Sequence, residues 1–157
     1  MDEARVLFIC NHNSARSLMA EAYLNQLGAG RFAAQSAGFE LRPANPLVVE
    51  AMAEVGIDLS RKEPQSVFDV YRRGGSFNYV IAVCATHVEV NCPIFPGVHK
   101  NRLRVVFPDP ARLSGPEDKQ LEAVRGIRDD IREQIGAFLA WAAAGAAGVP
   151  GPRWDRM

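Results

Sequence analysis

Short apolar runs alternate along the chain with stretches in which apolar residues recur at helical spacing. Continuous apolar runs are typical of strands that are covered on both faces, whereas a period near 3.6 indicates a helix with one buried face. The runs with the length of strands are 6–9, 32–36, 79–83 and 105–107, and helical spacing covers 17–27, 46–55 and 121–138. This alternation predicts an α/β fold of three layers, with a four-stranded parallel sheet between helices.

Chemically reactive side chains follow three of the predicted strands. Cys10 comes directly after the first strand and Cys84 directly after the third, while Asp109 follows the fourth, between two prolines. Ligands of open parallel sheets bind outside the carboxyl ends of the strands. We therefore expect Cys10, Cys84 and Asp109 to share one functional edge of the sheet.

The composition fits one compact domain. The chain has 157 residues, of which 48% are hydrophobic and 23% charged, and this excludes a disordered or collagen-like protein. Helical periodicity ends near Trp141, and glycine, proline and charged residues replace it afterwards. We predict a single catalytic domain over 1–144 and a flexible C-terminal tail over 145–157.

Charge and cysteine content narrow the class of partner and the compartment. The 18 Lys and Arg residues balance the 18 Asp and Glu residues, so no general field attracts nucleic acid or an anionic membrane. A signal-peptide core is absent, and the longest weakly polar stretch, 137–149, is shorter than the roughly 20 residues that span a bilayer. Three cysteines, an odd number, indicate reduced thiols rather than a secreted disulfide framework. We expect a cytoplasmic monomer that binds neither nucleic acid nor membranes.

Residues 10–17 have the pattern C-x5-R-S between a predicted strand and a predicted helix. In that setting successive backbone N–H groups converge on one anion, and the helix N-terminus adds a partial positive charge. Arg16 can hold a tetrahedral oxyanion through its fork of donors, and the Ser17 hydroxyl would stabilise Cys10 as a nucleophilic thiolate. The alternative is that Cys10 is a buried small hydrophobe and Arg16 a solvated helix residue. The predicted oxyanion-binding residues are Asn11, His12, Asn13, Ser14, Ala15, Arg16 and Ser17.

Several segments carry a resemblance to a known family. FICNHNSARSLMAEAYL resembles the phosphate loop and first helix of the low-molecular-weight protein tyrosine phosphatase fold, and in particular the branch that contains the thioredoxin-coupled arsenate reductases. The resemblance continues through QSAGFELRPANPLVVEAMAEVGIDLS, YVIAVC, CPIFPGV and PDPAR. It covers most of residues 5–140.

That resemblance implies arsenate reduction by a relay of thiols. Cys10 would attack arsenate, Cys84 would attack Cys10 and release arsenite, and Cys92 would attack Cys84 to leave a Cys84–Cys92 disulfide. Asp109 resembles the general acid of the fold, which protonates the leaving oxygen. The resemblance also implies no bound cofactor, thioredoxin as the external reductant, and phosphate or sulfate as oxyanions that compete with arsenate. The sequence leaves glutaredoxin or a small thiol such as mycothiol open as the reductant, but the Cys84 and Cys92 pair favours a protein dithiol.

A Cys84–Cys92 disulfide would constrain the chain between the two residues. Residues eight apart in a straight helix lie about 12 Å apart at about 1.5 Å per residue, whereas a disulfide needs Cα atoms within roughly 7 Å. We therefore expect segment 84–92 to be a loop, or a helix that unwinds on oxidation.

Two other functions stay open at this point. A low-molecular-weight protein tyrosine phosphatase would use Cys10, Arg16 and Asp109 through a phosphocysteine intermediate. Ala111-Arg112-Leu113 stands where phosphatases of the fold typically have tyrosines, which weakens that reading. A non-enzymatic anion or metal sensor is the third class.

Individual residues also have structural or metal-binding alternatives. Cys84 could be a buried strand end with Cys92 incidental, Asp109 could form a turn, and His12 could tune Cys10 or face solvent. Zinc-ligand types occur at Cys84, His87, Cys92 and His99, but their spacing matches no standard zinc finger. The resemblance implies potassium-site residues at Asn13, Glu21 and Ser36, without a clear counterpart to the fourth, a carboxylate. We therefore expect no bound metal.

Overall fold

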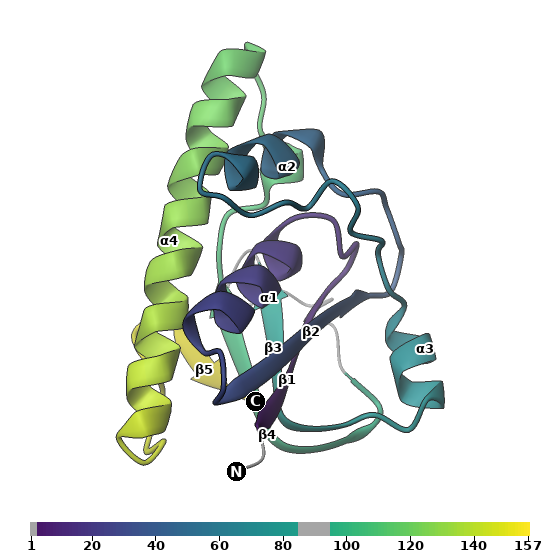
Figure 1. Cartoon of the computed structure of the whole chain (residues 1–157), viewed down its shortest axis with the longest axis vertical. Helices are drawn as coiled ribbons and strands as arrows, with labels where there is room; N and C mark the ends of the chain where they lie inside the picture. The colour runs from purple at the N-terminus through teal and green to yellow at the C-terminus, as the bar shows by residue number, and fades with distance from the viewer. Residues whose placement is uncertain (1–2, 85–94) are drawn as a thin grey trace.

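A computed structural model of the chain describes residues 3–84 and 95–157, with the backbone alone at Cys84 and Val98. The strands in this part of the chain are β1 (Ala4–Cys10), β2 (Phe32–Gly38), β3 (Ser76–Cys84), β4 (Val98–Val106) and β5 (Trp154–Arg156). They form one five-stranded sheet with the order β2-β1-β3-β4-β5 (Figure 1). Strands β1 to β4 run parallel, and β5 pairs antiparallel with β4.

Helices cover both faces of the sheet. They are α1 (Arg16–Leu27), α2 (Pro46–Ala53), α3 (Val67–Arg72) and α4 (Glu117–Ala143), with a short 3-10 turn, η1 (Pro110–Arg112). Side chains of α1, α2 and α4 share one apolar core with the sheet, and α3 contributes to a second core. Figure 1 accordingly shows α4 and α3 on opposite sides of the strands, so the fold has three layers.

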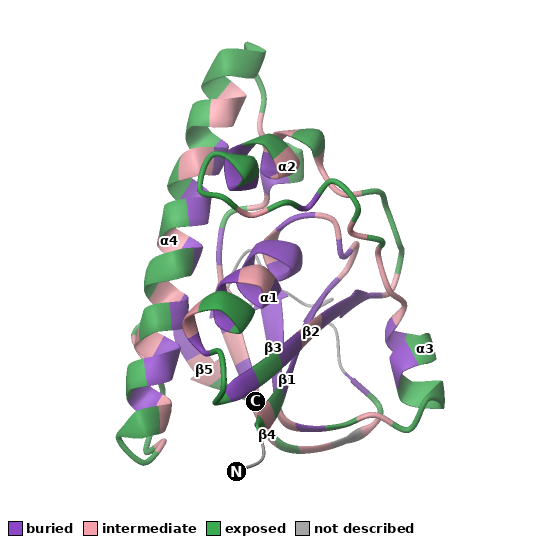
Figure 2. Ribbon diagram, in the orientation of Figure 1, coloured by how far each residue is buried: buried purple, intermediate pink, exposed green. Residues whose placement is uncertain are grey.

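Strand β1 supplies side chains to both cores. Val6 and Phe8 belong to the first core and Leu7 and Ile9 to the second, because alternate residues of a strand point to opposite faces. None of the four is more than 1% exposed, and burial of each contributes about 1.5–3 kcal/mol. The buried sheet interior in Figure 2 reflects this packing. Cys10 is therefore the last residue of a strand that is buried on both faces.

The structure confirms the predicted α/β fold and contains all four predicted strands. The apolar pattern does not predict α3, because six residues are too few to establish a helical period. The side chain of Ser66 caps this helix by accepting a hydrogen bond from the Phe68 N–H at 3.1 Å. Among the described residues, no helix combines the length and apolar character needed to cross a membrane.

The segment predicted as a flexible tail, 145–157, contains a short strand near its end. Trp154–Arg156 form β5, which adds an antiparallel strand to the predicted parallel four. Trp154 is 2% exposed, and its ring stacks on Phe138 with the centroids 5.9 Å apart. Its indole N–H donates to Gln134 at 2.9 Å. Three residues are too few to show a strand period in the sequence, which is why the apolar pattern does not predict this strand. The burial of Trp154 holds the segment on the sheet.

Candidate active site

The loop between β1 and α1 surrounds the sulfur of Cys10. Among the described side chains Cys10 is a free cysteine, and it is 4% exposed. Its Sγ accepts a hydrogen bond from the backbone N–H of Asn13 at 3.1 Å and lies 2.9 Å from Ser17 Oγ. Both neighbours are able to donate to a negatively charged sulfur, which is the form that attacks an electrophile.

Asn13 sets the direction of the Ser17 hydroxyl. Asn13 is fully buried, and its Nδ2 donates to Ser17 Oγ at 3.0 Å, so the proton of that hydroxyl is free to point at Cys10 Sγ. The Oδ1 atom of Asn13 accepts from the Gln65 N–H at 2.9 Å. With a φ of 51°, Asn13 has the left-handed backbone that Asn tolerates better than most residues. One side chain thus shapes the loop and orients the hydroxyl beside the nucleophile.

The carbonyl groups of the loop are held by the segment 39–45. The hydrogen bonds run from Phe39 and Glu40 to Asn11, from Arg42 to His12 and from Asn45 to Ser14, at 2.7–3.2 Å. In a trans peptide the carbonyl of one residue and the N–H of the next point in opposite directions, and the described chain has no cis peptide. The N–H groups of residues 12, 13 and 15 consequently point away from this segment. Such a row of inward N–H groups forms a cradle for an anion.

Gly38, at the end of β2, lets the loop pass close to the sheet. A Cβ atom at this position would lie 2.8 Å from Asn13 N and 2.9 Å from His12 C, which is closer than real Cβ contacts. Gly38 is absent from the predicted site residues. The signal for it is a glycine at the end of a strand, which marks a close approach of backbone.

Arg16 and Asp109 meet across the mouth of the loop. Arg16 Nη2 lies 3.6 Å from Asp109 Oδ2, and Arg16 Nη1 donates to the Phe107 carbonyl at 3.2 Å. The two side chains are only 11% and 18% exposed. The other carboxylate oxygen of Asp109 accepts from the Ala111 N–H at 2.9 Å and caps η1. Asp109 therefore forms the turn foreseen as an alternative and still presents an oxygen to Arg16.

His12 lies on the outer side of the loop. Its Nδ1 is 3.0 Å from the carbonyl oxygen of Glu40, in the segment that also holds the loop carbonyls. This contact adds a side-chain link between the loop and segment 39–45. A catalytic role for His12 stays a hypothesis.

Cys84 ends β3 at the same edge of the sheet as Cys10. Ile9 pairs with Ala82 across β1 and β3, so the backbones of Cys10 and Cys84 lie on neighbouring strand ends. Cys92 and the expectation of a loop or unwinding helix over 84–92 lie outside the described residues, apart from the backbone of Cys84. The thiol relay therefore stays a prediction.

The ammonium group of Lys62 lies beside Glu21, one of the residues that the resemblance associates with potassium. Lys62 Nζ lies 2.6 Å from the carboxylate of Glu21, which is 7% exposed. Burial raises the pKa of Glu21 above its ordinary value, and Lys62 offsets part of that rise. Asn13 Oδ1 is also occupied, by the Gln65 N–H. These residues do not fit a potassium ion, because the ammonium group takes the place of the cation.

Other metal sites find no support in 3–84 and 95–157, where no three His, Cys, Asp or Glu side chains gather. His99, one of the four zinc-ligand types in the sequence, has its Nδ1 2.9 Å from the Gly97 carbonyl. It also contacts the ring of Phe95. His87 and Cys92 lie outside the described residues.

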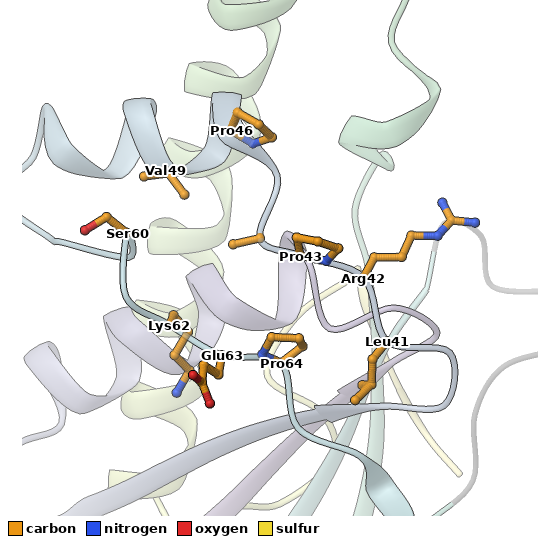
Figure 3. A pocket seen from close by; sticks show the side chains of 10 residues that line it. Leu41, Arg42, Pro43, Pro46, Val49, Ser60, Lys62, Glu63 and Pro64 are labelled. Atoms are coloured by element: carbon orange, nitrogen blue, oxygen red, sulfur yellow. The ribbon is translucent and has the colours of Figure 1, made fainter.

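A cavity of about 590 Å³ lies beside the oxyanion loop (Figure 3). Segments 41–49 and 60–64 line it, largely with proline and aliphatic side chains. Lys62 and Arg42 are among its lining residues, and in Figure 3 the Arg42 guanidinium points away from the other side chains. The backbone N–H of Arg42 holds the His12 carbonyl. The cavity thus borders segment 39–45, which holds the carbonyl groups of the loop. The reactive groups Cys10, Arg16 and Asp109 lie at the strand ends instead.

Comparison with known proteins identifies the family. The family model described as low molecular weight phosphotyrosine protein phosphatase matches residues 5–145. The chain belongs to this family. An arsenate reductase from Bacillus subtilis is 32% identical over 139 residues, which cover 88% of this chain and 96% of that protein. A glutaredoxin arsenate reductase from Synechocystis sp. is 31% identical over 136 residues, which cover 87% of this chain and 96% of that protein.

Solved structures give the same result. An arsenate reductase in the phosphate-binding state aligns with a TM-score of 0.64 and 28% identity, over 87% of this chain and 97% of that chain. The resemblance drawn from the sequence motifs is thereby confirmed at the level of family and fold.

Proposed function

We propose that the protein reduces arsenate to arsenite, with Cys10 as nucleophile, Arg16 as oxyanion ligand and Asp109 as general acid. The observation that carries the proposal is the position of the Cys10 sulfur, 3.1 Å from the Asn13 N–H and 2.9 Å from Ser17 Oγ, at the N-terminus of α1. Arsenate is the chosen oxyanion because relatives 31–32% identical over nearly their whole length are arsenate reductases.

The first step is substitution at arsenic. The Cys10 thiolate forms a sulfur–arsenic bond while the bond from arsenic to one arsenate hydroxyl breaks; this hydroxyl accepts a proton from Asp109 and leaves as water. The backbone N–H groups of residues 11–17 and the Arg16 guanidinium hold the remaining oxygens and their charge. The 3.6 Å separation of Arg16 and Asp109 supports both groups acting on one bound oxyanion.

The second step is the reduction itself. The Cys84 thiolate attacks the Cys10 sulfur, the electron pair of the sulfur–arsenic bond stays on arsenic, and arsenic(V) becomes arsenic(III), released as arsenite. The two electrons come from two thiolates, which become a Cys10–Cys84 disulfide. Cys92 then attacks Cys84, restores the Cys10 thiolate and leaves a Cys84–Cys92 disulfide.

An external dithiol closes the cycle, and we assign this role to thioredoxin. A Cys84–Cys92 disulfide needs two electrons, which a protein dithiol delivers in one encounter. The relative named as a glutaredoxin arsenate reductase makes glutaredoxin the competing donor. Rates of arsenite formation with each reductant, at equal concentration, distinguish the two. We further propose that the protein acts in the cytoplasm and that it acts as a monomer.

A single turnover tests the proposed function. Fully reduced, metal-free protein receives excess arsenate without reductant, and thiols, arsenite and disulfides are then counted. The expected result is two thiols lost per arsenite released, with the bridge between Cys84 and Cys92. Retention of all three thiols without arsenite would contradict the proposal.

The family name favours a second candidate, hydrolysis of a phosphate ester. Cys10, Arg16 and Asp109 would then act through a phosphocysteine, and Cys84 and Cys92 would take no part. Turnover of an aryl phosphate that persists when Cys84 and Cys92 are both replaced by Ser would support this function over arsenate reduction.

A further inference from the structure

Residues beyond the family match line the edge of the strand that leads to Asp109. The match ends at residue 145, whereas residues 153–157, here named the C-terminal strap, bond to β4 (Figure 1). The N–H of Val106 donates to the Arg153 carbonyl at 3.3 Å, and the N–H of Met157 donates to the Arg102 carbonyl at 3.0 Å. The strap thus accompanies β4 up to the residue before Phe107.

The strap is anchored on α4 at two points. Trp154 is buried against Phe138 and bonded to Gln134, as described above. The Arg156 guanidinium lies 5.8 Å from the centroid of the Trp141 ring and donates to the carbonyls of Gly148 and Ala146. Arg153 takes part in neither of these two anchors.

Arg153 extends from the strap to Phe107. Its guanidinium lies 5.9 Å from the centroid of the Phe107 ring and forms an ion pair with Asp130 of α4. Phe107 is 2% exposed, and its carbonyl is the one that accepts from Arg16 at 3.2 Å. Phe107 thus has a cation over its ring from Arg153 and a hydrogen bond to its carbonyl from Arg16, and the ion pair with Asp130 fixes the Arg153 side chain.

The loop after Phe107 borders an open hollow on the surface, although Phe107 itself is buried in the first core. A cavity of about 560 Å³ is lined by Phe107, Pro108 and Leu113 of this loop, by Ile127 and Asp130 of α4, and by Arg153. On the side of this hollow no atoms of the described residues pack against the loop. Contacts at Phe107, where the loop begins, therefore contribute to the position of Asp109.

We propose that Arg153 is a positioning residue that holds Phe107. Through Phe107 it fixes segment 107–113, which contains the general acid Asp109 and the carbonyl that binds Arg16. Its effect on rate rests on the proposed function, whereas its effect on the loop does not. The side chain of Arg153 is 42% exposed, so its replacement leaves the apolar core intact.

The test compares Arg153→Met with Arg156→Met in the full chain. Arg156 belongs to the same strap and also lies over an aromatic ring, but its contacts are on the Trp141 side. In Arg153→Met we expect hydrogen exchange of the Ala111, Arg112 and Leu113 amides to rise about tenfold. Single-turnover arsenite formation at saturating arsenate should slow about tenfold, because small displacements of a catalytic group are costly, with the half-saturating arsenate concentration changed less than twofold. Arg153→Lys restores both values, and Arg156→Met leaves both unchanged.

The outcomes separate this inference from the proposed function. Unchanged exchange over 107–113 in Arg153→Met overturns the inference whatever the activity, and so does an equal rise in exchange over β1. A wild-type protein that forms no arsenite contradicts the proposed function, while the exchange result still decides the role of Arg153. If Arg153→Met does not fold, Asp130→Asn removes the ion pair alone and should raise exchange over the same segment to a smaller extent.

Discussion

Ser17 Oγ lies 2.9 Å from Cys10 Sγ while it accepts a hydrogen bond from Asn13. An oxygen that already accepts one bond from an amide has its own proton directed elsewhere, and the sulfur is the neighbour in line. The nucleophile is thus prepared by a pair of polar side chains from its own loop, without a histidine base in contact with the sulfur among the described residues.

Replacement of Ser17 by Ala should slow alkylation of Cys10 by iodoacetamide at pH 7 about tenfold. A hydrogen bond to a charged group contributes about 1.5 kcal/mol or more, which corresponds to about a factor of ten in an equilibrium constant, and the variant removes this bond from the attacking sulfur. Ser60→Ala is the matched control, because the Ser60 hydroxyl bonds to Asp58 on the surface. Equal alkylation rates in Ser17→Ala and wild type would remove Ser17 from the account of the nucleophile.

Replacement of Gly38 by Ala should destabilise the protein by about 1–3 kcal/mol and weaken phosphate binding. The added Cβ would approach Asn13 N to 2.8 Å, so the cradle must shift. Gly126→Ala provides the control, because a Cβ there meets no described atom within 4 Å and Ala favours the α4 helix by about 0.5–1 kcal/mol. Urea unfolding and phosphate titration calorimetry measure the two effects. A Gly38→Ala protein with wild-type phosphate affinity would show that the loop does not need this close approach.

Replacement of Asp109 by Asn should lower the single-turnover rate of arsenite formation about 10²- to 10⁴-fold, the usual contribution of general acid catalysis. Asn still caps η1 by accepting from the Ala111 N–H, so stability should change little. Loss of the carboxylate 3.6 Å from Arg16 also removes a competitor for the guanidinium, and phosphate should bind as tightly as in wild type or more tightly. Weaker phosphate binding together with a wild-type rate would show that Asp109 supports oxyanion binding and does not act as the general acid.

Replacement of Lys62 by Met should destabilise the protein by about 1–3 kcal/mol at pH 7. The loss is smaller than for a fully buried ion pair, because Lys62 is 35% exposed and solvent screens its charge. Burial already raises the pKa of Glu21, and the variant loses the offset that Lys62 supplies. A raised carboxyl pKa favours the folded state below the unfolded pKa, and that contribution is lost as pH rises through the folded value. The deficit of the variant should therefore shrink between pH 7 and pH 5 in urea unfolding.

Lys119→Met is the control for Lys62, since the Lys119–Glu122 pair on α4 is exposed on both sides. Wild-type stability should be equal in KCl and NaCl of the same concentration, because the ammonium group of Lys62 neutralises Glu21. A selective stabilisation of wild type by potassium would contradict that assignment.

The parts of the site that are local in sequence could be predicted from it. The C-x5-R-S spacing after an apolar run locates the loop, and Cys10, Asn13 and Ser17 all contact one another within it. The contacts that support the loop join distant positions: Arg16 and the Phe107 carbonyl are 91 residues apart, and Asn13 and the Gln65 N–H are 52 apart. A pattern of apolar and polar residues contains no information on such pairs. The partner of Gly38 in the loop and the pairing of Lys62 with Glu21 therefore appear only once the fold brings the segments together.

Strand β5 has a consequence for association between molecules. Without it, β4 would be the outermost strand and would offer unpaired backbone groups near Leu103, Arg104 and Val105 to the strand of another chain. Residues 154–156 occupy that row, and Trp154 fills the apolar surface beneath it. The short strand therefore protects this side of the sheet against edge-to-edge aggregation, and loss of the last residues would expose both the β4 edge and the apolar surface beneath Trp154.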